Sequence, residues 1–410
     1  MVYRDYLYMW GASLSAGAAA WALIVGRGWL IYEMTDSALL IGVVTFAAMI
    51  PRVAITPFTG YLSDRFERKA VLALMFGASA TQNLVLAALV AFGWIEVWHL
   101  IALSFVDGSA RAAQMPAGQA LLPNLVPRSL ILNAIALNQA AVNGSRMLGP
   151  AAIAPLLAIT DGVNAGSAFF VCSGFYAASV FLTLRIKTAS TGKIDPSLGF
   201  TRNILEGLVY VYRTPSLRAI MLLAVFHCGL TMSFESLLPI ISHEQFRAEG
   251  AGFSYLMVGI GAGAIVTAIA MARIRSETTK GRLFLHLGVL SGVTPALLAI
   301  SPNMPIAVLA AATMGATQAG FMTLTHTMIQ SITVDGIRGR VGGVYSVHIG
   351  GTMATANLIN GGLADIFNTP ILLLLGGASF IVVMFLSWQM VTLRSIYMSG
   401  LNLSGETTIR

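Results

Sequence analysis

Ionisable side chains lie inside long apolar stretches of this sequence, where each is costly and is therefore a candidate for function. Asp107 and Arg111 fall in the stretch 97–119, and Arg146 falls in the stretch 133–158. If both stretches are helices running in opposite directions, Asp107 and Arg146 reach a similar depth and can form an ion pair. A substrate or a proton could then compete for Asp107 and release its partner. Two alternatives stay open, namely a static ion pair that fixes helix packing and a contact between Asp107 and Arg111 one turn away.

Further polar residues in the apolar stretches, several of them at helical spacing, are candidates to line a cavity between such helices, although the stripe that holds Asn357 and Asn360 could instead permit close helix contact. The candidates are Arg27, Arg52, Gln114, Gln139, Asn143, His227, Asn357 and Asn360. The first half of the chain would hold four buried arginines against the single central carboxylate of Asp107. We therefore expect an electropositive cavity that prefers an anionic or zwitterionic organic molecule.

Glu235 is a second candidate for carrying a proton. With Asp107, Arg111 and Arg146 it makes up the expected network for proton coupling. It lies toward one end of the stretch 217–241. An ordinary residue at the end of a helix is the alternative interpretation.

Other kinds of chemistry have no matching pattern in the sequence. It contains no P-loop, and its histidines lack the spacing of metal ligands. Cys172 and Cys228 both fall in apolar stretches and offer neither a CxxC site nor a disulfide framework. Because a clustered set of catalytic side chains is also missing, we expect no enzyme activity, no metal and no cofactor, with a proton gradient as the energy source.

The elements that must position these residues are membrane-spanning helices. The 410-residue chain is 56% hydrophobic and 10% charged, and its mean hydropathy is +0.78. A helix of about 20 apolar residues crosses a bilayer. The apolar stretches predict about twelve such helices, at 9–31, 38–60, 70–92, 97–119, 133–158, 165–186, 217–241, 252–273, 282–301, 304–328, 339–362 and 370–393.

The predicted fold class is thus an all-α membrane protein with two six-helix bundles. We expect the first bundle at 1–186, a cytoplasmic and partly helical linker at 187–216, and the second bundle with a short tail at 217–410. Parallel repeats of this kind are typical of transporters that move two halves around a site at mid-membrane depth.

The charges in the connections alternate along the chain. One set of loops is rich in Lys and Arg, and the other holds mainly Asp and Glu. Because cytoplasmic loops collect basic residues, both termini are expected in the cytoplasm, and the protein is expected to be a multi-pass protein of the cell's inner (plasma) membrane. The same placement argues against nucleic-acid binding despite a formal net charge of +7. We expect membrane lipid around the chain and a monomer.

The segment Gly60–Lys69 carries the most specific motif in the sequence. It reads Gly-Tyr-Leu-Ser-Asp-Arg-Phe-Glu-Arg-Lys and resembles the signature of the major facilitator superfamily, G-x-L-x-D-R-x-G-R-K/R. The resemblance implies that Asp64 caps the eleventh helix, which would begin near Arg338 and Arg340. The implied cytoplasmic gate comprises Gly60, Leu62, Asp64, Arg65, Arg68, Lys69, Arg338 and Arg340. A plain basic loop on the cytoplasmic side is the alternative, but it does not explain the Gly-Leu-Asp spacing.

Glu67 replaces the usual glycine of this signature, and siderophore exporters of the enterobactin type show a similar Asp-Arg-x-Glu-Arg-Lys run. With further similarity at Thr35–Ser37 and Gly149–Pro150, the chain resembles the drug, macrolide and siderophore exporter branch of that superfamily. The resemblance implies secondary active export of a small amphipathic molecule by alternating access, with exchange for protons. A lysophospholipid, other lipid or metabolite transporter of the same fold and a receptor that no longer transports are the alternatives.

Overall fold

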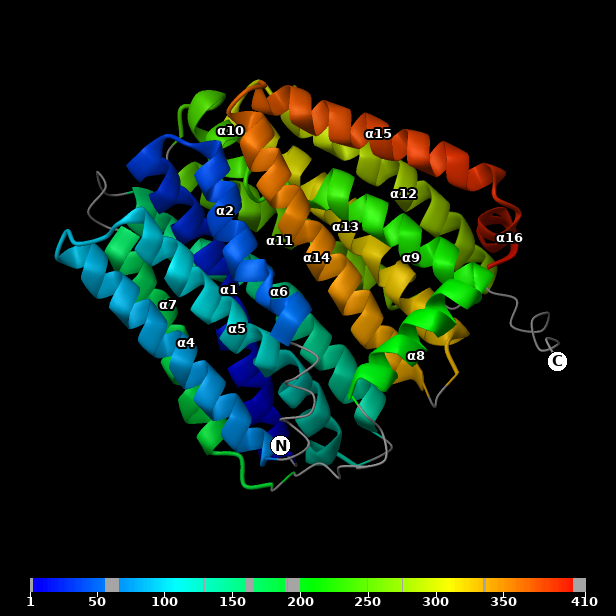
Figure 1. Ribbon diagram of the computed structural model, residues 1–410, viewed down its shortest axis with the longest axis horizontal. Coiled ribbons are helices and arrows are strands. Elements are labelled where there is room, and N and C mark those ends of the chain that lie inside the picture. Colours follow the sequence, from blue (N-terminus) through cyan, green and yellow to red (C-terminus); the bar gives the residue numbers. More distant parts are fainter. Residues whose placement is uncertain are drawn as a thin grey trace.

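The computed structural model of the protein is built from helices (Figure 1). It describes residues 3–55, 66–127, 130–158, 165–188, 190, 200–248, 250–274, 276–334 and 337–400, with the side chains of 132, 136, 165 and 200–204 left aside. The predicted all-helical class is confirmed for these residues.

The first part of the chain forms long helices at positions close to those predicted. They are α1 (Arg4–Thr35), α2 (Ala38–Met49), α4 (Arg68–Ala91), α5 (Val97–Leu121), α6 (Ile131–Ala158) and α7 (Ala165–Leu184), with the short 3₁₀ helix η1 (Leu122–Leu125) after α5. Ser37 begins α2 as its N-cap, because its hydroxyl accepts a hydrogen bond from the Leu40 N–H.

The second part begins with α8 (Phe200–Arg213), a strongly amphipathic helix inside the predicted linker. The following elements are α9 (Pro215–His227), the π-helix η3 (Cys228–Met232), α10 (Leu238–Glu244), α11 (Gly250–Met271), α12 (Glu277–Ala299), α13 (Met304–Ile332), α14 (Arg338–Ala364), α15 (Thr369–Gln389) and α16 (Val391–Ser399). In Figure 1, α4, α5 and α7 lie on one side of the molecule and α12, α15 and α16 on the opposite side.

Nine helices among the described residues are long and apolar enough to cross a membrane. The helices α5, α6 and α14 exceed about 20 residues as well, but their polar side chains make them less apolar than the nine. These three helices carry Asp107, Arg146 and Asn357 in turn. These three long helices therefore contain most of the candidate residues for the charge network and the cavity.

The predicted continuous helix at 217–241 is wrong, because the chain there divides into α9, η3 and α10. The hydroxyls of Thr231 and Ser233 donate to the carbonyls of His227 and Cys228, at 2.8 and 2.7 Å. Such short side-chain bonds to the backbone compete with the regular helical ladder. Residues 233–237 consequently leave the helix, and Glu235 lies in this break.

The two parts of the chain meet along two helix pairs, α2 with α14 and α6 with α11. Glycines allow the close approach. A Cβ on Gly42 would lie 2.9 Å from the Asn357 carbonyl oxygen, and one on Gly261 would lie 2.8 Å from the Met147 amide nitrogen. Small residues at such contacts let helix backbones pack directly in a membrane, where lipid offers no hydrophobic driving force for association.

Candidate functional site

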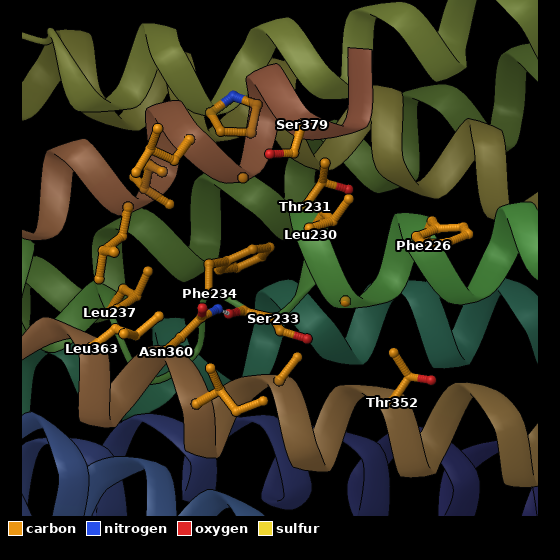
Figure 2. Close-up of a pocket in the computed structure, with 18 of the residues that line it drawn as sticks. Phe226, Leu230, Thr231, Ser233, Phe234, Leu237, Thr352, Asn360, Leu363 and Ser379 are labelled. Carbon is orange, nitrogen blue, oxygen red and sulfur yellow. Dashed lines mark hydrogen bonds between the residues drawn. The ribbon is translucent and has the colours of Figure 1, made fainter. Parts of the chain in front are cut away.

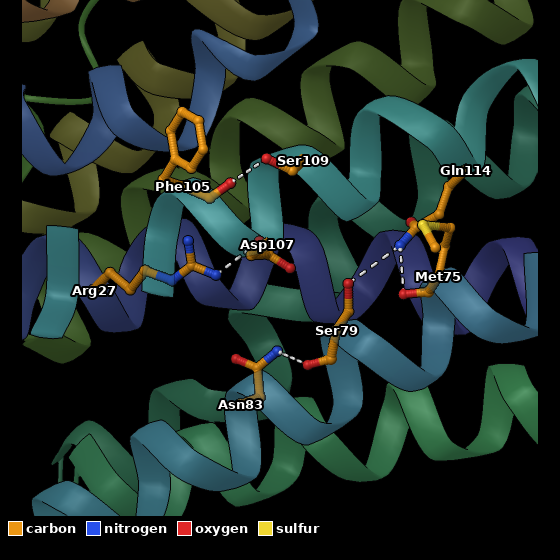
Figure 3. Close-up of polar contacts among 8 residues, drawn as sticks. All are labelled: Arg27, Met75, Ser79, Asn83, Phe105, Asp107, Ser109 and Gln114. Atoms are coloured by element: carbon orange, nitrogen blue, oxygen red, sulfur yellow. Dashed lines mark hydrogen bonds and ion pairs between the residues drawn. The ribbon is translucent and has the colours of Figure 1, made fainter. Parts of the chain in front are cut away.

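The buried ion pair of the first part joins Arg27 of α1 to Asp107 of α5 (Figure 3). Arg27 Nη2 lies 2.7 Å from Asp107 Oδ2, and the two side chains are 5% and 0% exposed. The second carboxylate oxygen, Oδ1, has no hydrogen-bond partner among the described residues. Full burial makes this pair costly to form and costlier to break, because removing one partner leaves an isolated charge.

This pairing corrects the prediction that Asp107 binds Arg146 or Arg111. The prediction assumed that helices consecutive in sequence are neighbours in space. In the structure, α1 packs against α6 and α7 and also touches α5, so α1 supplies the partner.

Arg146 of α6 also finds its partner on α1. Its guanidinium carbon lies 4.6 Å from the centre of the Trp21 ring. A guanidinium over an indole face is a favourable cation–π contact, and it leaves the charge free to attract an anion. Two of the four predicted arginines thus have a partner that involves α1, because Arg27 of α1 pairs with Asp107 and Arg146 packs on Trp21 of α1.

Glu235 lies opposite the remaining positive charge. Its side chain is 3% exposed, and its Oε2 has no hydrogen-bond partner among the described residues. It interacts electrostatically with Arg146, Arg52 and Arg111, all from the first part of the chain. No ion pair within 4.0 Å joins Glu235 to any described cation. Glu235 therefore balances the arginines across the contact between the two parts of the chain, without a direct bond.

Side chains of α13 and α14 hold the helix break around Glu235 in place. The Asn357 Oδ1 accepts a hydrogen bond from the Ser236 N–H at 3.2 Å, and the Asn360 amide donates to the Ser233 carbonyl at 2.5 Å. Gln318 donates to the Thr231 carbonyl at 2.6 Å. Sequence reasoning missed Gln318. It placed the two asparagines on a cavity wall; in the structure their amides satisfy the open backbone, and Asn360 also lines a pocket.

Two further predicted cavity residues lie within the packing of their own half, which corrects that prediction. Gln114 donates to the Ser79 hydroxyl at 3.2 Å and thereby joins α5 to α4 (Figure 3). His227 is fully buried, shares a hydrogen bond of 3.0 Å with Ser291 and lies 4.4 Å from the Phe321 ring centre. Aromatic packing, rather than a polar cavity, explains this histidine.

Gln139 and Asn143 lie on α6, before Arg146. Gln139 is exposed and Asn143 is half-buried. Arg52 and Arg111 are also half-buried, and they influence each other electrostatically. A role for these four residues in a cavity stays a prediction.

The expected cytoplasmic gate is described only in part, since Gly60, Leu62, Asp64 and Arg65 lie outside the described residues. Arg68 donates to the Ala120 carbonyl at 2.9 Å, and Lys69 donates to the Ile186 carbonyl at 3.2 Å. Both acceptors belong to the first part of the chain.

On the other side of the expected gate, Arg340 forms an ion pair with Glu206 of α8. Arg338 donates to the Thr333 carbonyl at 3.4 Å. The linker helix is thereby attached to the first turn of α14.

Asp365 makes an equally specific contact at the opposite end of α14. Its carboxylate accepts hydrogen bonds from the Ala38 and Leu39 N–H groups, at 2.7 and 3.1 Å, and from the Ser37 hydroxyl at 3.2 Å. The end of α14 thus caps the start of α2, where the helix dipole favours a negative charge. No motif in the sequence pointed to this contact.

Comparison with known proteins places the whole arrangement in a family. A family model described as a transmembrane secretion effector matches residues 2–401. The chain is 25% identical over 355 residues to the multidrug efflux pump Tap of Mycolicibacterium fortuitum, which covers 81% of this chain and 82% of that protein. It is 21% identical over 268 residues to the staphyloferrin A transporter of Staphylococcus aureus, which covers 65% of this chain and 66% of that protein.

A likeness to solved structures concerns the fold alone. The crystal structure of the nucleoside transporter NupG superposes with a TM-score of 0.72, covering 93% of this chain and 98% of that chain at 12% sequence identity.

Proposed function

The chain belongs to the transmembrane secretion effector family of major facilitator transporters, and from this premise we propose that it exports a small amphipathic organic molecule such as a drug or a siderophore. Four half-buried or buried arginines against two carboxylates, Asp107 and Glu235, carry the proposal. Excess positive charge where the two halves meet favours an anionic or zwitterionic cargo, which the guanidinium groups can bind in a bidentate manner. The relatives are named as a multidrug efflux pump and a staphyloferrin A transporter, which supports a drug or a siderophore as the cargo.

The same proposal includes the topology. The helices α5, α6 and α14 are 25, 28 and 27 residues long and pack among the nine candidate spans. We infer that they also cross the membrane, which restores the predicted twelve-span count with both termini in the cytoplasm. The halves 1–186 and 217–410 then move as two bodies in the plasma membrane, joined by the linker 187–216, and the protein works as a monomer.

For coupling, we assign the exchanged proton to Glu235. The Arg27–Asp107 pair joins α1 to α5 within the first half, so it does not itself link the two halves. Glu235 instead faces arginines of the opposite half without a direct ion pair, and it can take up a proton without breaking one. Protonation of Glu235 leaves the positive charge of the arginines less compensated, which favours binding of an anionic cargo. Release of the cargo again favours the charged carboxylate, and Glu235 loses its proton.

The test is transport by proteoliposomes under an imposed pH gradient, with a panel of siderophores and drugs. We expect Glu235→Gln to abolish gradient-driven transport but to retain exchange of cargo between the two sides. The matched control is Glu277→Gln, which changes an exposed carboxylate of α12. Gradient-driven transport that survives Glu235→Gln but is lost in Asp107→Asn would return the coupling role to Asp107.

A second test addresses the cargo class. Arg52→Gln and Arg146→Gln are expected to lower transport of anionic cargo by about tenfold or more, which corresponds to about 1.4 kcal/mol, and to spare cationic drugs. Equal loss for both classes would contradict the electropositive cavity. Absence of transport in every arm would favour the receptor alternative.

A further inference from the structure

An apolar groove lies on the second half, and none of the described residues that line it is charged (Figure 2). It has a volume of about 430 Å³ and is formed by α9, η3, α14 and α15, with Pro295 of α12. This volume falls within the range of about 300–1,000 Å³ that is usual for ligand pockets. Most of its lining is apolar, and the hydroxyls of Thr352 and Ser379 are among the few polar groups (Figure 2).

The walls and rim of the groove belong to helices that we expect to face the bilayer. Two of its walls, Pro215–Met232 and Thr369–Gln389, are candidate membrane spans, and α15 is the least buried of all nine. The rim residues Phe226, Ile359 and Leu375 are 48%, 55% and 58% exposed. Because membrane hydrocarbon surrounds these helices, a molecule that occupies the groove reaches it from the lipid phase.

The inner wall of the groove is the helix break between η3 and α10. Ser233, Phe234 and Leu237 line the groove, while Glu235 of the same segment interacts with the arginines of the first half. Phe234 and Leu237 are each only 2% exposed. A single non-helical segment therefore separates the lipid-facing groove from the charged cluster, and Asn360, which also lines the groove, ties that segment to α14.

We propose that this groove binds the apolar limb of an amphipathic anion taken from the bilayer, and that residues 233–237 are the partition between this site and the arginine cluster. The proposal rests on the proposed function and narrows its cargo to molecules that partition into the membrane. The apolar limb occupies the groove, and its acidic group is attracted by the excess positive charge beyond the partition.

The site can be tested without any transport. A benzophenone-labelled dodecanoate is photolysed with the purified full-length protein in lipid nanodiscs, and the labelled peptides are identified by mass spectrometry. We expect labelling of α9 and α15 near Phe226 and Leu375, and at least a fivefold loss in Ala356→Phe and in Ser379→Phe, which fill the groove. The matched control is Ala378→Phe, because Ala378 is exposed on α15 but does not line the groove.

A competition experiment distinguishes binding of cargo from binding of ordinary membrane lipid. Excess unlabelled dodecanoate is expected to remove the labelling, whereas an equal excess of phosphatidylcholine is expected to leave it. Displacement by both would mean that the groove holds annular lipid only, and unchanged labelling in the filled variants would mean that no site exists there. Both results overturn the proposal.

A transport measurement then distinguishes failure of the groove site from failure of the proposed export function. In proteoliposomes, the filled variants are expected to slow export of a long-chain amphipathic anion at least fivefold and to leave a short-chain, water-soluble analogue unchanged. If wild type transports neither compound but still shows specific labelling, the proposed function fails and the groove site stands.

Discussion

The two halves of the protein use polar groups in opposite ways. The first half buries a complete ion pair, Arg27–Asp107, and sets Arg146 on Trp21, so its charges are held by rigid helices around α1. The second half contributes Glu235 to the centre and places it on a helix break that amide side chains support. The comparison shows that the first half places its charges on regular helices, whereas the second half places its central carboxylate on a non-helical segment that three amide side chains support.

The largest effect is expected from breaking the fixed ion pair. Arg27→Met leaves Asp107 charged and buried, and we expect a loss of about 3–5 kcal/mol in stability. Denaturation in detergent micelles measures it. The double variant Arg27→Met/Asp107→Leu removes both charges and is expected to recover most of the loss. Single and double variants of equal stability would show that the pair does not hold the first half together.

Disturbing the helix break in the second half is expected to lower stability less than breaking the Arg27–Asp107 pair. Asn357→Leu leaves the buried Ser236 N–H without its acceptor, at a cost of about 1–3 kcal/mol. The same measurement applies, with Met353→Leu one turn earlier on α14 as the control. Because Glu235 shares this segment, gradient-driven transport should fall as well. A stability loss larger than that of Arg27→Met would reverse the assignment of the rigid half.

The next largest loss of stability is expected at the contact between the halves. Asp365→Ala removes the carboxylate that accepts from the first N–H groups of α2 and leaves the N-cap Ser37 in place, and such capping bonds contribute about 1 kcal/mol. We expect that loss in the detergent assay. The neighbouring Ile366→Ala, at a side chain that is 75% exposed, is expected to cost nothing measurable. Equal stability of both variants would mean that Asp365 does not hold α2 and α14 together.

The smallest effect is expected at the linker. The Arg340–Glu206 pair is partly exposed, and such pairs contribute about 1 kcal/mol or less. Glu206→Gln should therefore barely change stability, and its effect should fade in high salt. Glu277→Gln, at the exposed pair with Lys280, is the control. A loss well above that of the control would show that α8 is a structural clamp.

Much of the helical framework could be predicted from the sequence, because an apolar stretch must form its hydrogen bonds internally in a membrane. The predicted bounds at 304–328 and 339–362, for example, fall inside α13 and α14. The family resemblance was confirmed, although it was carried by a motif of which only the final residues are described.

The site was harder to predict, because helical periodicity gives the face of a residue but not the helix opposite it. Asp107 has the predicted burial, yet its partner is on α1 rather than on the next helix. His227 fits a polar face by spacing, but aromatic rings surround it. The break at Glu235 depends on hydroxyl bonds of Thr231 and Ser233, which are local enough that a Thr-x-Ser sequence before Glu235 could have suggested it.

The contact between Arg146 and Trp21 gives the protein an internal optical probe. An indole under a guanidinium emits differently once the cation moves away, so cargo that draws Arg146 off the ring should change the fluorescence of Trp21. A variant that retains Trp21 and replaces the other five tryptophans with phenylalanine would isolate this signal. The occupancy of the positive cluster could then be followed in real time, with unlabelled cargo and without a transport assay.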